Sequence, residues 1–423
     1  MHLRKKNPDG PAADRTHVPA TRLTRRGFFR ASAAAGVAGA AIGVLSFCGS
    51  NDADDDSEPV VVDSDSAVSV TADDSPYEFI DEYGYTPEAT YTLPLGTVLR
   101  PAEGTWVPVT IAGSSATPMV KAGAFSSETG TLSEVVSSPV SDAATVVIYD
   151  VACSDSVYAW TELDTTDRSW TLYAAKFSDG ELTGDPQKLW DTTSDYDPAP
   201  IACSGSKVIW QIQPSYSGKK TSEHSFAYVW AIGEQNVRQC VKSPGRFATK
   251  PTVSGANCIL TPRVRADEGT YYGVTAFSIS DNLSTKIDQL VLPASVKPFR
   301  ATRVGDKFVI SIEASYSTGG LLSKMGTYIG TRTGGFVKVD REPSECPAGH
   351  NGIYLVKSRS SYVVVGTEEQ KYSSLVSIDR AVDYGEYPAR CGDCELFVTF
   401  ATVKDADTGY PASVTVRTFR LNA

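Results

Sequence analysis

A short polar turn followed at once by a β-forming run recurs seven times along this chain. The turns are centred on Gly104, Asp155, Gly205, Gly255, Gly305, Arg359 and Gly392. Successive turns are 51, 50, 50, 50, 54 and 33 residues apart. A repeat of about 40–50 residues that is rich in β signals is typical of a β-propeller. The sequence therefore predicts an all-β fold of seven blades, each a four-stranded antiparallel sheet.

The unit around Gly205 shows how one repeat makes one blade. A short run at 200–203 precedes the turn, and a second β-forming run follows at 207–212. After a polar loop, two more runs follow at 226–232 and 237–241. Glycine at the first turn position favours a type II′ hairpin, whose twist matches that of antiparallel strands.

The two ends of the chain complement each other. The last unit offers only three β-forming runs, at 388–391, 395–403 and 412–421, while an additional run at 89–93 precedes the first turn. We expect this N-terminal run to complete the last blade, because closure removes the edges that an open ring would expose. The 54-residue interval predicts a longer loop within 338–351.

The net charge of −11 is distributed unevenly. Residues 1–50 carry 8 basic and 2 acidic residues, whereas residues 51–86 carry 12 acidic residues and no basic ones. An acidic, Ser-rich segment repels itself, so 51–86 is predicted to be a disordered linker ahead of a propeller at 87–423. The chain has no strong basic patch of the kind that nucleic-acid binding needs, so we expect no nucleic-acid partner.

The N-terminal segment carries targeting features. Arg25 and Arg26 are followed by Gly27 and two aromatic residues, which resembles a twin-arginine export motif. We interpret 1–50 as the export signal and expect a protein of the cell envelope or surface, or a secreted one, that contacts membrane only through this segment. Cys48 is a lipidation candidate, although Phe47 is larger than the residue usual there. The alternatives are a cleaved soluble form and an uncleaved anchor.

The order of a short inner strand, a tight turn and an apolar strand resembles the TolB-like and PD40-like propellers. The resemblance covers roughly residues 87–423. Those families favour a Ser-Pro-Asp-Gly turn, which no unit of this chain contains. The resemblance therefore implies seven blades and says little about chemistry.

Seven cysteines lie beyond the export segment. Cys391 and Cys394 flank a two-residue turn, which would bring them within disulfide reach, and we expect a structural staple there. Cys153 and Cys203 occupy matching places on adjacent inner strands, where they either pair or remain as buried thiols. Zinc would need further ligands, and the propeller contains only two histidines, so we expect neither metal nor cofactor.

Propellers usually bind ligands at the mouth of the central channel, where loops enter the innermost strands. Positions five residues before the turns, together with charged residues near them, predict a rim made of the following residues: Asp197, Arg246, Lys250, Arg300, Arg303, Tyr354, Tyr387 and Arg390. Arginine forks bind carboxylates and tyrosine rings stack on sugars, so this rim suits an anionic or sugar ligand. The alternative is that these loop charges are merely solvated.

Signals for catalysis are few. The chain has no Gly-x-Ser-x-Gly elbow, and two histidines leave little general-base capacity beyond carboxylates. We therefore expect no catalytic residues, and a monomeric, non-catalytic scaffold that binds a protein, peptide or glycan. The alternative is a carbohydrate-active enzyme such as a polysaccharide lyase, which would use the Arg/Lys rim with a carboxylate or a tyrosine.

Overall fold

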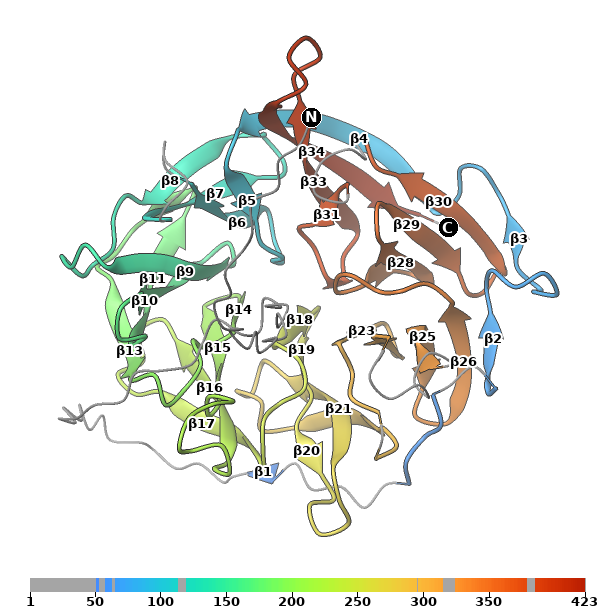
Figure 1. Cartoon of the computed structure of the whole chain (residues 1–423), viewed down its shortest axis with the longest axis horizontal. Coiled ribbons are helices and arrows are strands. Elements are labelled where there is room, and N and C mark those ends of the chain that lie inside the picture. Colours follow the sequence, from blue (N-terminus) through green and yellow to red (C-terminus); the bar gives the residue numbers. More distant parts are fainter. Residues whose placement is uncertain are drawn as a thin grey trace, which may run out of the picture. The chain divides into compact units, whose positions relative to one another are not determined.

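Seven sheets are arranged in a ring in the computed structural model (Figure 1). The structure describes residues 51–52, 58–62, 65–112, 119–294, 296–314, 324–378 and 385–422, within a unit that spans Gly43–Ala423. The predicted export signal, with Arg25, Arg26 and Cys48, lies outside these residues. The regular elements among the described residues are all strands, and none of those residues forms a helix that could cross a membrane. The prediction of an all-β propeller is confirmed.

The first four sheets in chain order run from an inner to an outer strand. The first contains β5 (Thr97–Leu99), β6 (Trp106–Ile111), β7 (Lys121–Ser126) and β8 (Leu132–Val136). The second contains β9 (Val146–Cys153), β10 (Val157–Asp164), β11 (Trp170–Ser178), β12 (Glu181–Leu182) and β13 (Gln187–Thr192). The third contains β14 (Ile201–Ser204), β15 (Lys207–Ile212), β16 (Ser225–Ala231) and β17 (Arg238–Ser243). The fourth contains β18 (Thr252–Ser254), β19 (Asn257–Leu260), β20 (Arg263–Val264), β21 (Tyr271–Ser278) and β22 (Lys286–Val291).

Three further sheets complete the ring. The fifth contains β23 (Arg300–Val304), β24 (Lys307–Ile312), β25 (Gly326–Thr331) and β26 (Gly334–Val339). The sixth contains β27 (Ala348–His350), β28 (Ile353–Ser358), β29 (Ser361–Gly366) and β30 (Lys371–Val376). The seventh contains β31 (Tyr387–Pro388), β33 (Leu396–Lys404), β34 (Pro411–Leu421) and β4 (Tyr85–Pro94).

The core lies in the layers between neighbouring sheets. In β10 the first seven positions are all buried, although the run contains Thr161 and Glu162. Trp210 of β15 packs in one apolar cluster with Ala159 and Leu172 of the preceding sheet. A middle strand is thus covered on both faces, which explains why these strands are apolar almost throughout instead of alternating.

One predicted turn belongs to a different hairpin. Arg359 lies between β28 and β29, because Ser358 pairs with Ser361. The inner turn of the sixth sheet is formed by Asn351 and Gly352, since His350 pairs with Ile353. The expected longer loop is also wrong, because the connection 340–347 has eight residues, as many as the connections that enter the fourth and fifth sheets.

The segment that was predicted to be a disordered linker lies along the outer strands. β1 (Asn51–Asp52), β2 (Ala67–Ser69) and β3 (Glu78–Phe79) pair in parallel with β17, β26 and β30. We call residues 58–62 and 65–84 the belt. Val62, Val70 and Tyr77 are buried against the sheets, while the acidic residues of the belt are exposed. The prediction of disorder does not hold for the belt, because Val62 packs in an apolar cluster with residues of the fourth and fifth sheets, and Val70 and Tyr77 pack in another with Val339 and Val365.

Two short segments connect parts of the ring that are distant in sequence. β4 pairs antiparallel with β34, and Thr92 lies opposite Thr415. β32 (Gly392–Asp393) leaves the seventh sheet and pairs in parallel with β27 of the sixth. The amide of Asp393 also donates a hydrogen bond to Ser254 Oγ in β18 of the fourth sheet (2.8 Å). β32 therefore crosses the middle of the ring, and we call it the plug.

Candidate functional site

The candidate site lies where the connections between sheets enter the innermost strands. A cavity of about 340 Å³ opens there between the first and last sheets. Its lining includes Leu99, Arg100, Glu345, Tyr387 and Phe400. This volume is at the small end of the range for ligand pockets.

Glu345 lies at this mouth among four positively charged side chains. Its loop is held against β28 by a hydrogen bond from the Ser344 amide to the carbonyl oxygen of Lys357 (3.3 Å). Burial raises the pKa of the Glu345 carboxyl above its ordinary value. Four cations oppose this rise without cancelling it: Arg300, Lys357, Lys250 and Arg100. Arg300 Nη2 lies 3.8 Å from Oε2 of Glu345, which is a long ion pair.

Lys357 is a second buried charged group at this mouth. Only 2% of this residue is exposed, and burial lowers its pKa to about 8 even though Glu345 and Glu386 act in the opposite direction. Glu386 is also bound by Arg417, which donates to its carboxylate from Nε and Nη2. Glu345 and Lys357 are therefore an acid and a base whose pKa values burial has moved towards each other.

Asp150 of β9 links two further cations. Lys250 Nζ lies 3.3 Å from Oδ2 of Asp150, and Arg100 Nε lies 3.9 Å from Oδ1. Within the described part of the chain, the buried Nε of Arg100 has no hydrogen-bond acceptor. We call six residues the mouth cluster: Arg100, Asp150, Lys250, Arg300, Glu345 and Lys357. Four cations against two carboxylates give the cluster a formal charge of +2 when all are ionised.

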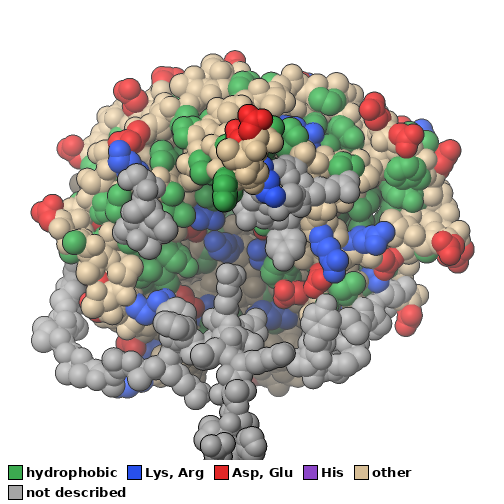
Figure 2. Space-filling view, turned by 45° about the horizontal axis from the view of Figure 1, so that its top comes forward, with side chains coloured by type: hydrophobic (Ala, Val, Ile, Leu, Met, Phe, Trp, Pro, Cys, Tyr) green, Lys and Arg blue, Asp and Glu red, His purple; other side chains and the backbone are tan. Residues whose placement is uncertain are grey.

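Lys and Arg side chains are visible in the hollow of the face shown in Figure 2. Others lie on the surrounding surface beside Asp and Glu side chains, most of which are near the outer edge. Tyr387 adds an aromatic surface beside the cavity, since its ring centroid lies 5.9 Å from that of Phe400. Lys357 Nζ is 5.0 Å from the centre of the Tyr387 ring. The mouth thus combines cations with a flat aromatic surface.

Of the predicted rim residues, Lys250, Arg300 and Tyr387 come together at this mouth. Asp197 and Arg246 form a separate ion pair (Oδ2 to Nη2, 2.8 Å). Arg246 also lies over the ring of the exposed Tyr216, with its guanidinium carbon 3.8 Å from the ring centroid. Burial acts to raise the pKa of Tyr216, but Arg246 and Lys297 outweigh it and lower that pKa.

The other three predicted residues are in the interior. Arg303 forms a largely buried ion pair with Asp288 of the neighbouring sheet (3.5 Å). Tyr354 is buried in an apolar cluster with Val309, so the prediction that it lines the rim is wrong, because it was counted from the misplaced turn at Arg359. Arg390 is also buried, in a different part of the ring.

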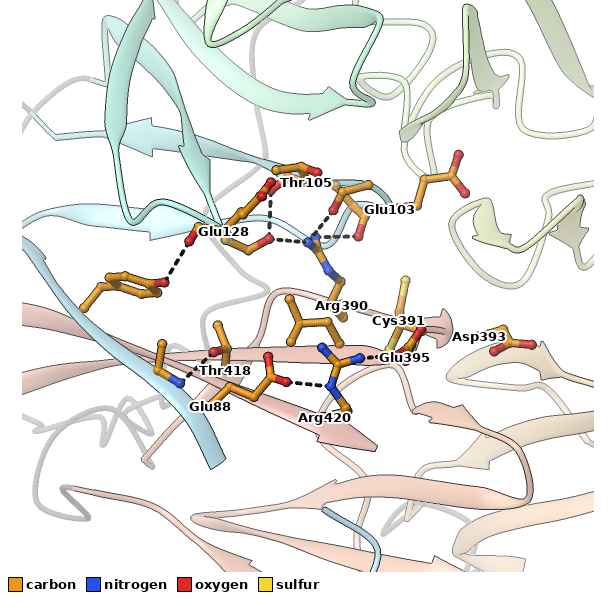
Figure 3. A pocket seen from close by; sticks show the side chains of 17 residues that line it. Glu88, Glu103, Thr105, Glu128, Arg390, Cys391, Asp393, Glu395, Thr418 and Arg420 are labelled. Carbon is orange, nitrogen blue, oxygen red and sulfur yellow. Dashed lines mark hydrogen bonds and ion pairs between the residues drawn. The ribbon is translucent and has the colours of Figure 1, made fainter. Parts of the chain in front are cut away.

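Arg390 lines a second cavity, of about 620 Å³, which Figure 3 shows from close by. Its guanidinium donates to the carbonyl oxygens of Ala102 (2.9 Å) and Gly104 (2.6 Å) and to Ser127 Oγ (3.2 Å). Arg420, on the other side of the same cavity, binds the carboxylates of Glu88 and Glu395. Arg390 therefore joins the last sheet to the first instead of offering its donors to a ligand.

The mouth-cluster residues that are absent from the predicted rim are Arg100, Asp150, Glu345 and Lys357. The signal was present for Glu345, because counting five residues back from the true turn at Asn351 reaches Cys346, its neighbour. The described residues contain no group of three or more His, Cys, Asp or Glu placed to hold a metal ion.

The predicted Cys391–Cys394 staple is not formed, and both thiols are free. Gly392 and Asp393 between them form the short strand β32, which pairs with β27, so they are not the tight turn that was predicted. The Cys391 side chain instead hydrogen-bonds that of Cys346. Cys153 and Cys203, which were predicted either to pair or to stay buried, are buried free thiols.

Comparisons with known proteins give no family for this chain. No family model matches it, and no curated protein matches it. Among solved structures it is similar to the β-propeller domain of the Trilobed protease from Pyrococcus furiosus, at 10% identity and a TM-score of 0.40, over 60% of this chain and 79% of that one. An acylaminoacyl peptidase matches at 10% identity and a TM-score of 0.46, over 79% of this chain and 51% of the peptidase. The chain thus spans about half the length of that peptidase.

Proposed function

We propose that this chain is a non-catalytic binding scaffold of the cell envelope that holds a protein, peptide or glycan at the channel mouth. The group that it recognises is a carboxylate, and the favoured ligand is an acidic glycan. The observation that carries this proposal is the +2 charge of the mouth cluster beside a cavity whose Arg100 Nε lacks an acceptor among the described residues. The resemblance to TolB-like and PD40-like propellers belongs to the same proposal.

The chemistry of the mouth supports this ligand class. A carboxylate beside Arg100 and Arg300 would accept charge-assisted hydrogen bonds, which are stronger than neutral ones. The existing ion pairs at this mouth are 3.3 to 3.9 Å long, so a ligand carboxylate can compete with Asp150 and Glu345 for the same cations. Tyr387 and Phe400 offer the aromatic surface on which a sugar ring stacks.

Calorimetric titration with an oligogalacturonate, and with its neutral methyl ester, tests the proposal. We expect the acid to bind and the ester to bind at least about tenfold more weakly, since a hydrogen bond to a charged group contributes roughly 1.5–3 kcal/mol. Lys250→Ala should weaken binding by a similar factor. Lys188→Ala is the matched control, because Lys188 forms a comparable ion pair with Asp191 (3.4 Å) on the outer strand β13.

Two results would count against the proposal. One is that no acidic glycan and no acidic peptide binds the full chain. The other is that Lys188→Ala weakens binding as much as Lys250→Ala does. Binding of an acidic peptide alone would keep the carboxylate site and change the class of partner.

A second candidate is a polysaccharide lyase, which the lowered pKa of Lys357 favours. In such a reaction a base removes the proton on the carbon next to the uronate carboxyl. The glycosidic oxygen then leaves with a proton from an acid, and a carbon–carbon double bond forms in the sugar. Ultraviolet absorbance of the unsaturated product, lost in Arg300→Ala, would favour the enzyme. Unchanged absorbance across acidic polysaccharides would exclude it.

We also propose that the chain is exported by the twin-arginine route and acts as a monomer in the envelope or outside the cell. The proposed export route rests on the motif at Arg25 and Arg26. Replacing both arginines by lysine should retain the protein inside the cell, and export of that variant would contradict the proposal. Mass spectrometry of the mature N-terminus shows whether Cys48 carries a lipid.

We infer that each of the seven sheets is one blade and that β4 closes the ring. The pairing of β4 with β34, from Tyr85 opposite Leu421 to Pro94 opposite Ser413, supports this inference. A crystal structure with six blades, or with β4 apart from β34, would refute it.

A further inference from the structure

Two cysteines that are 45 positions apart in sequence meet where the plug joins the sixth sheet. β27 and β32 run in parallel, with Ala348 opposite Gly392. The amide of Gly392 donates to the carbonyl oxygen of Pro347 (3.0 Å). Cys346 and Cys391 immediately precede this paired stretch, and their side chains hydrogen-bond each other.

These two cysteines are also among the partly exposed cysteines of the described part of the chain. Cys346, Cys391 and Cys394 are partly exposed, whereas the other described thiols are buried: Cys153, Cys203, Cys240 and Cys258. The amide of Cys394 donates to the carbonyl oxygen of Gly349 (2.9 Å), on the other side of the plug residues from Cys391 in sequence. A small oxidant that enters this part of the ring therefore meets two adjacent thiols from different sheets.

We propose that Cys346 and Cys391 are a redox site that closes to a disulfide by exchange with a small-molecule or protein disulfide, and so ties the plug to β27. The bond would link the segment before β27 of the sixth sheet to the plug, which leaves the seventh sheet. It would also fix the position of Glu345, the neighbour of Cys346 in the mouth cluster.

The surroundings assign the two thiols different roles. The hydrogen bond from Cys391 lowers the pKa of Cys346 against the effect of burial, and Arg300 adds to this lowering. The same hydrogen bond and burial raise the pKa of Cys391. Cys346 is therefore the thiol that becomes a nucleophilic thiolate more readily.

The exchange balances in two steps. The Cys346 thiolate attacks one sulfur of the external disulfide, whose S–S bond breaks, and the first thiol is released. Cys391 then loses its proton and attacks Cys346, which releases the second thiol. Two protein thiols are oxidised, and one external disulfide is reduced to two thiols.

The test uses the full chain, reduced and then incubated with oxidised glutathione. Free thiols are alkylated, and the protein is digested with trypsin together with a protease that cleaves before aspartate. Cleavage before Asp393 separates Cys391 from Cys394, so the wild-type protein alone shows which of them is linked. We expect a Cys346–Cys391 cross-link and its loss after reduction.

Variants sharpen the result. Cys394→Ser should keep the cross-link, and Cys391→Ser should abolish it. In the reduced wild-type protein, iodoacetamide should modify Cys346 at least about tenfold faster than the four buried thiols, a readout that needs no variant. A Cys391–Cys394 loop, a cross-link that survives Cys391→Ser, or equal labelling of Cys346 and the buried thiols would overturn the proposal.

Discussion

The replacement Gly392→Ala tests whether the plug is held as tightly as its contacts indicate. Gly392 has a φ of +72°, in the left-handed region that residues with a Cβ atom rarely adopt. A Cβ atom at this position would lie 2.8 Å from both Cβ and Oγ of Ser254 and 2.9 Å from the carbonyl oxygen of Val253. Ordinary contacts between carbon atoms are about 3.5–4.0 Å, so either the plug or β18 must move.

The expected loss of stability has three parts. The left-handed backbone costs roughly 1–2 kcal/mol with a Cβ atom. Crowding against β18 adds about 1–3 kcal/mol. The shift would also lengthen the 2.8 Å hydrogen bond from the Asp393 amide to Ser254 Oγ, which is worth about 1 kcal/mol. Gly392→Ala should therefore lower the free energy of unfolding by roughly 3–6 kcal/mol.

Gly205→Ala is the matched control. Its φ is +53°, but nothing lies within 4 Å of the added Cβ atom, so only the backbone cost of roughly 1–2 kcal/mol applies. Urea unfolding of both variants, followed by fluorescence, measures the difference. Equal losses in the two variants would refute the close contact between the plug and β18.

Two further predictions concern the mouth cluster and the belt. The pKa of Lys357 is about 8 in the folded protein against an ordinary 10.5, so between these pH values the unfolded chain holds a proton that the folded one has lost. Stability relative to Lys357→Met should therefore rise with pH across this interval, by up to roughly 3 kcal/mol, and parallel curves of unfolding free energy against pH would contradict this. Val70→Ser should cost about 2 kcal/mol in urea unfolding because Val70 is buried. Val68→Ser, at a neighbouring belt position that is 46% exposed, should cost little, and equal effects would show that the belt is not docked.

The propeller could be predicted from the sequence because the turns keep a nearly constant spacing even where their residues differ. It misled at Arg359, since both hairpins of the sixth sheet have polar, tight turns and only strand pairing distinguishes them. The belt was missed for a different reason. Val62, Val70 and Tyr77 lie in a segment whose composition is acidic on average, and that average does not reveal which few side chains are buried.

Counting five residues back from the correct turns at Gly255 and Gly305 found Lys250 and Arg300. Tyr387 was also found, although its count began at Gly392, which lies in the plug instead of a turn. The sequence alone could have excluded Arg303 from the predicted rim. Residues three positions apart on a strand point to opposite faces, and Arg300 faces the mouth. The direction of Arg390 depends on the backbone carbonyls of Ala102 and Gly104, which no side-chain pattern records.

The pairing of β4 with β34 has a consequence for how the protein is made. In most repeat proteins each unit contacts only its neighbours, so folding can begin during synthesis and spread. Here Pro94 pairs with Ser413, which lies 319 positions later in the chain. The seventh sheet therefore lacks some of its strands until β34 has been synthesised. A ribosome that stalls before β34 therefore leaves a chain with an unfilled edge at each end, which chaperones and proteases can recognise as unfinished.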